Sequence, residues 1–109
     1  MGTEIELAVS PAEDNNEVLQ LLEEVRNKIA AKGQEYGAAI DPLLTIKTAA
    51  RLSGKTPMDV INSFMLKHET SLHLSDTGQV PLTTMQYSDK ATDLAVYYLL
   101  KVLVKYECG

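Results

Sequence analysis

The sequence predicts an all-α protein, a bundle of four to five helices in a single domain that spans residues 1–109. Three observations lead to this fold class. Apolar residues recur at helical spacing along most of the chain, and several helix start and stop signals can be read directly. In addition, 109 residues that are 45% hydrophobic suffice for one compact core and not for two.

One long helix is expected in the N-terminal part of the chain. Residues 1–10 alternate only weakly between apolar and polar side chains, and we interpret them as a loose arm. From about Pro11, apolar residues take the spacing i, i+3, i+4, i+7 and i+11 of a helix with one apolar face: Val18, Leu21, Leu22, Val25 and Ile29. Gly33 and Gly37 mark the end of this helix. The polar segment 32–37 is therefore expected to be a loop, and loops often carry function.

A tight hairpin of two helices is the centre of the predicted fold. Asp41 is a capping residue and Pro42 suits a first helical position. A helix is therefore expected from Pro42 to about Ser53, with Gly54 ending it.

The second helix of the hairpin is expected to begin after Thr56. This threonine is its cap, Pro57 is its first residue and Asp59 completes a capping box. Apolar side chains then return at helical spacing: Val60, Ile61, Phe64, Met65 and Leu72. The hairpin also has the outline of a DNA-binding helix-turn-helix, but its recognition positions carry Thr, Pro, Met and Asp, which do not read bases.

The most hydrophobic helix is expected at the C-terminal end. Residues 75–87 contain Gly78, Pro81 and several hydroxyl side chains, and we interpret them as a long connecting loop. Ser88 then caps a helix that runs to Glu107. Apolar residues spread around nearly the whole of this helix. We therefore expect a second copy of the chain to cover part of it, so that the protein is a homo-oligomer and most simply a dimer.

Charge and composition exclude several classes of function. The formal net charge is -5, and Lys and Arg are spread along the chain, so we expect neither DNA, RNA nor an anionic membrane as a partner. No apolar run approaches the ~20 residues that cross a bilayer, and the N-terminus lacks the pattern of a signal peptide, so a cytoplasmic location is expected. Cys108 is the only cysteine, which excludes an internal disulfide.

Two aspartates in the last helix carry the first chemical hypothesis. Asp89 and Asp93 lie one turn apart, and Tyr97 follows one turn later on the same face. Carboxylates at this spacing can share a Mg²⁺ ion that keeps several waters for a phosphate to displace. The alternative is that the acidic residues only complement the dipole of the helix N-terminus.

Several cations are candidates for binding phosphate. Lys47 and Arg51 lie one turn apart and can hold a phosphate together; alternatively they are solvated or pair with glutamates of the first helix. Lys67 is a further cation in mid-helix. We interpret its neighbour His68 as a core or boundary residue, and the five-residue spacing to His73 does not match a zinc site.

Taken in order, these residues resemble a known family. The motifs are Lys32-x-x-Glu35-Tyr36-Gly37, Ile46-Lys47-x-x-x-Arg51-Leu52, Thr56-Pro57-x-Asp59-Val60, Met65-Leu66-Lys67 and Asp89-Lys90-x-x-Asp93-Leu94-x-x-Tyr97. Over roughly residues 28–106 the chain resembles small phage and prophage proteins of the all-α nucleotide pyrophosphohydrolase group, the MazG-like superfamily. The resemblance implies a helical bundle, usually dimeric or tetrameric, in which acidic side chains hold Mg²⁺ and a nucleoside triphosphate. The nucleotide is hydrolysed to monophosphate and pyrophosphate.

The resemblance also implies a site. Glu35 and Asp93 would be catalytic, and Asp89 and Asp93 would be the metal ligands. Cationic and aromatic side chains would contact the nucleotide: Lys32, Tyr36, Lys47, Arg51, Lys67 and Tyr97. The family's catalytic members carry an E-x-x-E pair and an E-x-x-D pair, and this chain has neither spacing. Three functions stay open: Mg²⁺-dependent nucleotide hydrolysis, non-catalytic binding of a nucleotide or nucleotide-derived signal, and a structural module that binds other proteins.

Overall fold

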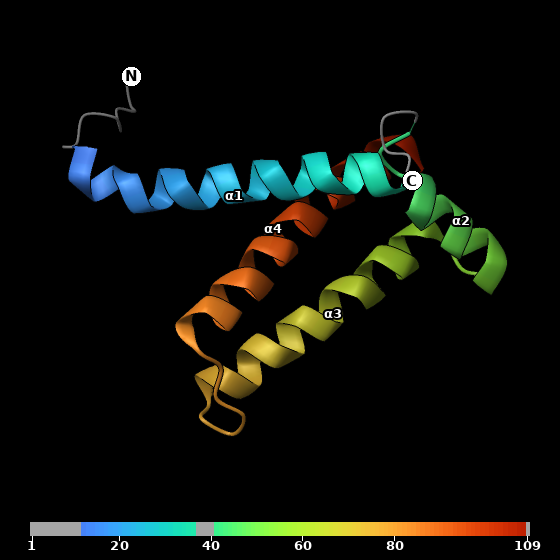
Figure 1. Cartoon of the computed structure of the whole chain (residues 1–109). Helices are drawn as coiled ribbons and strands as arrows, with labels where there is room; N and C mark the ends of the chain where they lie inside the picture. The colour runs from blue at the N-terminus through green and yellow to red at the C-terminus, as the bar shows by residue number, and fades with distance from the viewer. Residues whose placement is uncertain (1–11, 37–40, 109) are drawn as a thin grey trace, which may run out of the picture.

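The computed structural model describes residues 12–36 and 41–108, with the side chains of residues 16–31 and 41–108. Over these ranges the chain forms helices and no strands, which confirms the predicted all-α class (Figure 1). The helices are α1 (Ala12–Tyr36), α2 (Leu44–Ser53), α3 (Pro57–Asp76) and α4 (Thr84–Glu107). None of the described helices combines the length and apolar character needed to pass through a membrane.

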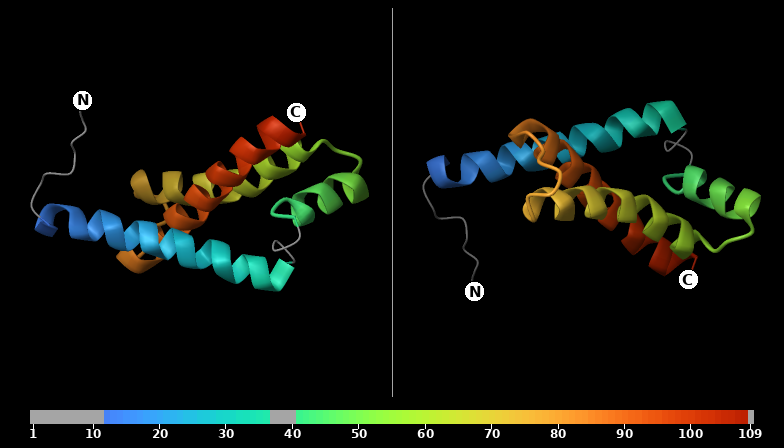
Figure 2. Two further views of the ribbon diagram at one scale, coloured as in Figure 1. Left: turned by 90° about the horizontal axis from the view of Figure 1, so that it is seen from above. Right: turned by 90° about the horizontal axis from the view of Figure 1, so that it is seen from below.

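Helices α3 and α4 form an antiparallel hairpin, and the other two helices pack against this hairpin (Figures 1 and 2). Helix α2 packs on α3, whereas α1 crosses α4 and projects with its N-terminal end beyond the other helices. The main core lies where α2, α3 and the C-terminal half of α4 meet, and its buried residues are Leu43, Ile46, Ala50, Val60, Ile61, Met65 and Val104.

The turn between α2 and α3 matches its sequence signals. Gly54 ends α2 with φ at 70°, a left-handed conformation that glycine adopts without steric cost. Thr56 caps α3, because its hydroxyl oxygen accepts a hydrogen bond from the Asp59 backbone N–H at 3.1 Å. Pro57 is the first residue of α3, so the predicted start of this helix is confirmed.

The start of α2 differs from the prediction by two residues. Asp41 uses its carboxylate to accept a hydrogen bond from the Leu43 backbone N–H at 2.9 Å, and its carbonyl oxygen accepts one from Leu44 at 3.0 Å. These bonds form a separate turn before the helix. The helix therefore begins at Leu44 and not at Pro42.

Helix α1 is longer than the sequence predicted. The segment 32–37 was expected to be a loop, but the helix continues through Tyr36. A glycine inside a helix costs only ~1 kcal/mol relative to alanine, and a helix of 25 residues tolerates Gly33 at that cost. The expected loose arm at 1–10 and Gly37 lie outside the described residues.

The connection between α3 and α4 is shorter than the predicted loop 75–87. It comprises residues 77–83, because α3 runs to Asp76 and α4 begins at Thr84. A reciprocal capping box starts α4: the Thr83 hydroxyl accepts from the Gln86 backbone N–H at 3.1 Å, and the Gln86 side chain accepts from the Thr83 N–H at 2.9 Å. Ser88 lies inside the helix and is not its cap, so that prediction was wrong.

Candidate functional site

A lysine of α1 joins the two aspartates of α4 where these helices cross. Lys28 Nζ donates to Asp89 Oδ1 and to Asp93 Oδ1 at 2.8 Å each, and to the Asp89 carbonyl oxygen at 2.9 Å. The Lys28 side chain is only 18% exposed. The ammonium therefore has three acceptors and little room for water, and it ties α1 to the N-terminal part of α4.

The contacts between Lys28 and the aspartates shift the pKa of Lys28 and that of Asp89. Burial of the ammonium opposes its charge, but the hydrogen bonds to Asp89 and Asp93 outweigh this effect and raise the pKa of Lys28 above its ordinary value. The hydrogen bond from Lys28 lowers the pKa of Asp89. Both groups are therefore charged across the neutral pH range.

Aromatic rings from α3 and α4 stack beside this ion pair. The ring of Tyr97 stacks on that of His68 at a centroid distance of 5.7 Å and makes a tilted contact with that of Phe64 at 5.9 Å. Burial lowers the pKa of His68 below its ordinary value, although the carboxylate of Asp93 acts in the opposite direction. Helices α1, α3 and α4 thus bring a charged group and an aromatic stack together. We call Lys28, His68, Asp89, Asp93 and Tyr97 the three-helix cluster.

The structure brings some of the predicted site residues together and separates others. Asp89, Asp93 and Tyr97 lie in the three-helix cluster, and Lys67 is exposed next to His68 on α3. Lys47 is elsewhere, because its ammonium contacts Asp41 at 2.9 Å and Glu107 at 3.8 Å.

The distance between these two places is large. Glu107 follows Asp93 by 14 residues on α4, which corresponds to about 21 Å along the helix. Lys47 therefore does not reach the aspartates within one chain. Arg51 lies one turn beyond Lys47, exposed in the last turn of α2. Lys47 was alternatively expected to be solvated or to pair with glutamates of the first helix. It does pair with acidic residues, but these are Glu107 of α4 and Asp41 in the turn before α2.

Three predicted residues lie at the end of α1. The side chains of Lys32, Glu35 and Tyr36 lie outside the described residues, but their backbone is helical. Because seven residues make almost two helical turns, position 35 falls on the same side of α1 as Lys28. Position 35 therefore lies on the same side of α1 as the three-helix cluster, almost two helical turns beyond Lys28.

Sequence reasoning missed Lys28. A signal was present, because Leu21, Val25 and Lys28 follow one another at i, i+4 and i+7. A lysine that continues an apolar series sits at the border of a buried face and needs a carboxylate partner there. The i, i+4 pair Asp89 and Asp93 offers that partner.

The carboxylate pair was expected to hold Mg²⁺. Within the described residues no group of three or more His, Cys, Asp or Glu side chains is placed to share a metal ion. Two carboxylates suit a Mg²⁺ ion that brings phosphate oxygens and waters as its other ligands. In the observed arrangement the Lys28 ammonium already pairs with both, so the pair fits Mg²⁺ only if Lys28 moves away.

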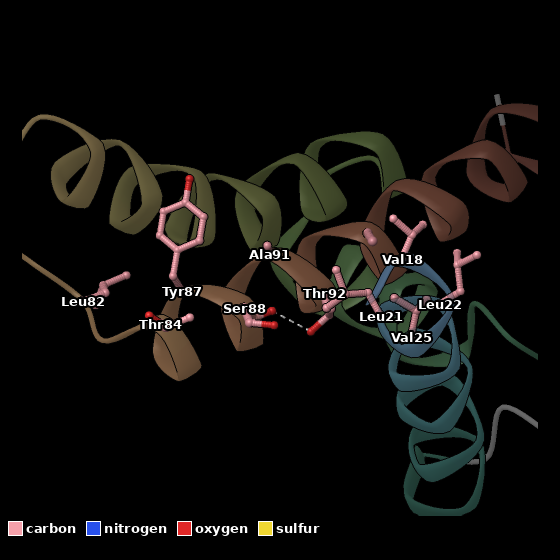
Figure 3. A pocket seen from close by; sticks show the side chains of 11 residues that line it. Val18, Leu21, Leu22, Val25, Leu82, Thr84, Tyr87, Ser88, Ala91 and Thr92 are labelled. Atoms are coloured by element: carbon pink, nitrogen blue, oxygen red, sulfur yellow. Dashed lines mark hydrogen bonds between the residues drawn. The ribbon is translucent and has the colours of Figure 1, made fainter. Parts of the chain in front are cut away.

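An apolar groove runs beside the ion pair, between α1 and α4 (Figure 3). Its volume is about 680 Å³. Val18, Leu21, Leu22 and Val25 of α1 face α4 across it. The α4 wall includes small side chains: Ser88, Ala91, Thr92 and Ala95. The Thr92 hydroxyl donates to the Ser88 carbonyl oxygen at 2.9 Å, so this polar group is satisfied within α4.

Comparisons of the chain with protein family models, with curated proteins and with solved structures found no match.

Proposed function

We propose that this protein binds a nucleotide, or a nucleotide-derived signal, at the three-helix cluster, as the resemblance to MazG-like proteins implies. The observation that carries the proposal is the meeting of three helices at one place, with a carboxylate pair and a cation beside an aromatic stack. A nucleotide has a charged end and an aromatic end. The cluster offers a complementary group to each.

Each part of the cluster suits one part of the ligand. The ring of His68 is half-buried and stacks on Tyr97, and a base can extend such a stack. Lys28 can turn from the aspartates to a phosphate, since an ammonium on a flexible four-carbon stem binds phosphate as a point charge. Asp89 and Asp93 would then be free to hold a Mg²⁺ that arrives with the phosphates.

Binding without hydrolysis is better supported than catalysis. The described residues of the cluster supply two carboxylates, and Lys28 forms an ion pair with each of them. Hydrolysis with Mg²⁺ bound would require a metal-activated water and a base to orient it. Glu35 stays the candidate for that base, because its position is in line with Lys28 on α1. Nucleotide pyrophosphohydrolysis is therefore the second candidate function.

Calorimetry with nucleoside triphosphates and cyclic dinucleotides, with and without Mg²⁺, tests the binding proposal. Asp93→Asn should weaken binding that depends on Mg²⁺ by about tenfold, since one charged ligand of the metal is lost. Asp59→Asn is a matched control, because Asp59 lies at the exposed start of α3. Absence of heat with every ligand would rule out nucleotide binding at this site.

A pyrophosphate assay on the same samples separates the two functions. Heat without release of pyrophosphate identifies a binder, whereas turnover in the presence of Mg²⁺ or Mn²⁺ identifies a hydrolase. Loss of turnover in Glu35→Gln with binding retained would assign the base.

We also propose that the protein is a homodimer. Large apolar side chains are exposed on α1 and on the outer face of α4, and they include Val18, Leu22, Leu99, Val102 and Tyr106. Contiguous apolar surface of this kind is rare on monomers, because its exposure to water is unfavourable. Light scattering at micromolar concentration tests the proposal. A mass that stays at 12.0 kDa at all dilutions would contradict it.

A further inference from the structure

The apolar stripe of α1 is covered only at its middle. Val18, Leu22, Val25 and Ile29 lie on one side of the helix, at i, i+4, i+7 and i+11. Val25 is 8% exposed, because α4 crosses there, whereas Val18 is 57% and Leu22 is 58% exposed. On the N-terminal side of Val25 the stripe lines the open groove between α1 and α4 (Figure 3).

The outer face of α4 shows the same pattern. Ala91 and Ala95 line the groove under α1, and the stripe continues toward the C-terminus through Leu99, Val102 and Tyr106. These last three side chains are half or more exposed. Helix α1 therefore covers the N-terminal half of the α4 stripe and leaves the C-terminal half open.

The two uncovered stripes carry opposite charges along their edges. Glu17 and Glu24, seven residues apart, lie along one edge of the α1 stripe; Glu17 is exposed, and Glu24 is half-buried beside the start of α4. Lys101 and Lys105, four residues apart, lie along one edge of the α4 stripe, and Lys101 also lies 6.0 Å from the ring of Tyr98. One chain thus carries an acidic, apolar helix face and a basic, apolar helix face, and the apolar side chains of both are largely exposed.

We infer that these two stripes bind each other between two copies of the chain. The N-terminal half of α1 from one copy lies on the outer, C-terminal half of α4 of the other copy, and the reverse contact forms at the same time. A two-fold axis requires this reciprocity. Because α1 lies over α4 within one copy, the two α1 helices form one layer of the dimer and the two α4 helices form the other. The inference rests on the proposed dimer and specifies its surfaces.

The available surface is sufficient for a stable dimer. The exposed apolar side chains on or beside the two stripes are Val18, Leu21, Leu22, Ile29, Tyr98, Leu99, Val102 and Tyr106. Their exposed area is on the order of 800 Å², about what one partner of a standard interface buries. The flanking charges fix the direction and register of the pairing, because like charges placed opposite each other are unfavourable.

Charge reversal tests the pairing. The double variant Glu17→Lys/Glu24→Lys places lysines opposite Lys101 and Lys105, and the double variant Lys101→Glu/Lys105→Glu places glutamates opposite Glu17 and Glu24. Each variant alone should dimerise at least about tenfold more weakly than the wild type. A mixture of the two should regain the dimer as a heterodimer, because both reciprocal contacts then join opposite charges. Sedimentation equilibrium of each variant and of the mixture measures this.

The outcomes separate the inference from the proposals on which it rests. A wild-type dimer that Glu17→Lys/Glu24→Lys leaves unchanged overturns the pairing of α1 with α4 and retains the dimer. A wild type that stays monomeric throughout the micromolar range overturns both. Calorimetry with nucleotides on the wild type and on Lys101→Glu/Lys105→Glu reports on the three-helix cluster independently, since neither lysine belongs to the cluster.

Discussion

At the scale of single residues, Lys28 of α1 combines burial with charge in the described part of that helix. Its ammonium is largely buried, and it satisfies the two carboxylates and one carbonyl oxygen that surround it. Without it, Asp89 and Asp93 would repel each other one turn apart on α4. A side chain that reduces the repulsion between two like charges and joins two helices therefore has a structural role whether or not a nucleotide binds.

Replacement of this lysine should destabilise the fold. Lys28→Met keeps the length of the stem and removes the charge, and we expect it to lower the free energy of unfolding by about 1–2 kcal/mol. Lys55→Met, in the exposed turn between α2 and α3, is the control and should change stability little. Urea denaturation followed by circular dichroism measures both. An equal effect of the two substitutions would contradict the role of the ion pair.

The difference in the free energy of unfolding between Lys28→Met and the wild type should depend on pH in a defined direction. Because the pKa of Asp89 is lowered in the fold, its contribution is complete above its ordinary value of 3.8 and is lost as the pH falls through the folded-state value. Because the pKa of Lys28 is raised, its contribution is complete below 10.5 and is lost as the pH rises through the folded-state value. The stability difference should therefore be constant near neutral pH and shrink below about pH 4.

His68 gives the protein a second dependence on pH. Burial holds the pKa of His68 below 6.5, so the folded protein resists a proton that the unfolded chain accepts. Asp93 favours the protonated form, whereas nearby cations oppose it: Lys90, Lys67 and Lys28. Stability should accordingly be complete above about pH 6.5 and fall on acidification through the folded-state pKa.

The substitution His68→Asn should remove the part of the acid sensitivity that comes from His68. Denaturation midpoints at about pH 7.5 and about pH 5.5 should differ less in His68→Asn than in the wild type. His73→Asn is the matched control, because His73 is the only other histidine and is exposed in the last turn of α3. Equal acid sensitivity in the wild type and in His68→Asn would contradict the assignment.

At the scale of elements, the accuracy of the sequence predictions followed the strength of the local signals. The turn at Gly54 and Thr56 was predicted correctly, since a left-handed glycine and a threonine cap have few alternatives there. The start of α4 was predicted wrongly. Both Thr83 and Ser88 precede an apolar helical pattern, so either could be the N-cap. Gln86 decides between them, because its side chain accepts a hydrogen bond from the Thr83 backbone N–H.

The two candidate caps of α4 can be distinguished by mutation. Thr83→Ala removes the hydroxyl that accepts from Gln86 and should cost about 1 kcal/mol of stability. Ser88→Ala changes a hydroxyl inside the helix and should stay within about 0.5 kcal/mol of the wild type. Chemical denaturation of both variants measures the difference. A larger loss in Ser88→Ala would mean that the helix begins later than described.

At the scale of the whole molecule, the helical class could be predicted, but the relative placement of the candidate residues could not. Periodicity places Asp89, Asp93 and Tyr97 on one side of a helix, and this local inference was correct in the structure. Periodicity carries no information on which helices cross. Lys47 was therefore assigned to the same site as the aspartates although it pairs with Glu107 at the other end of α4, and Lys28 was overlooked.

The exposed apolar face of α4 should decide how the protein assembles. Leu99 on the outer face of α4 is 53% exposed in one chain, and Leu66 on α3 is 61% exposed. The two leucines look equivalent in the monomer. If a second copy covers α4, only Leu99 becomes buried, and a glutamine there would lose its contact with water. Burial of an amide without a partner costs ~1–3 kcal/mol, so Leu99→Gln should raise the dimer dissociation constant by about tenfold or more.

The melting temperature of an associating protein rises with its concentration, because association stabilises the folded state by mass action. The wild type and Leu66→Gln should both show this rise in differential scanning calorimetry, and Leu99→Gln should show it only at higher concentration. If Leu66→Gln reduced the rise as much as Leu99→Gln, an interface confined to the outer face of α4 would be contradicted, because α3 would then take part in it.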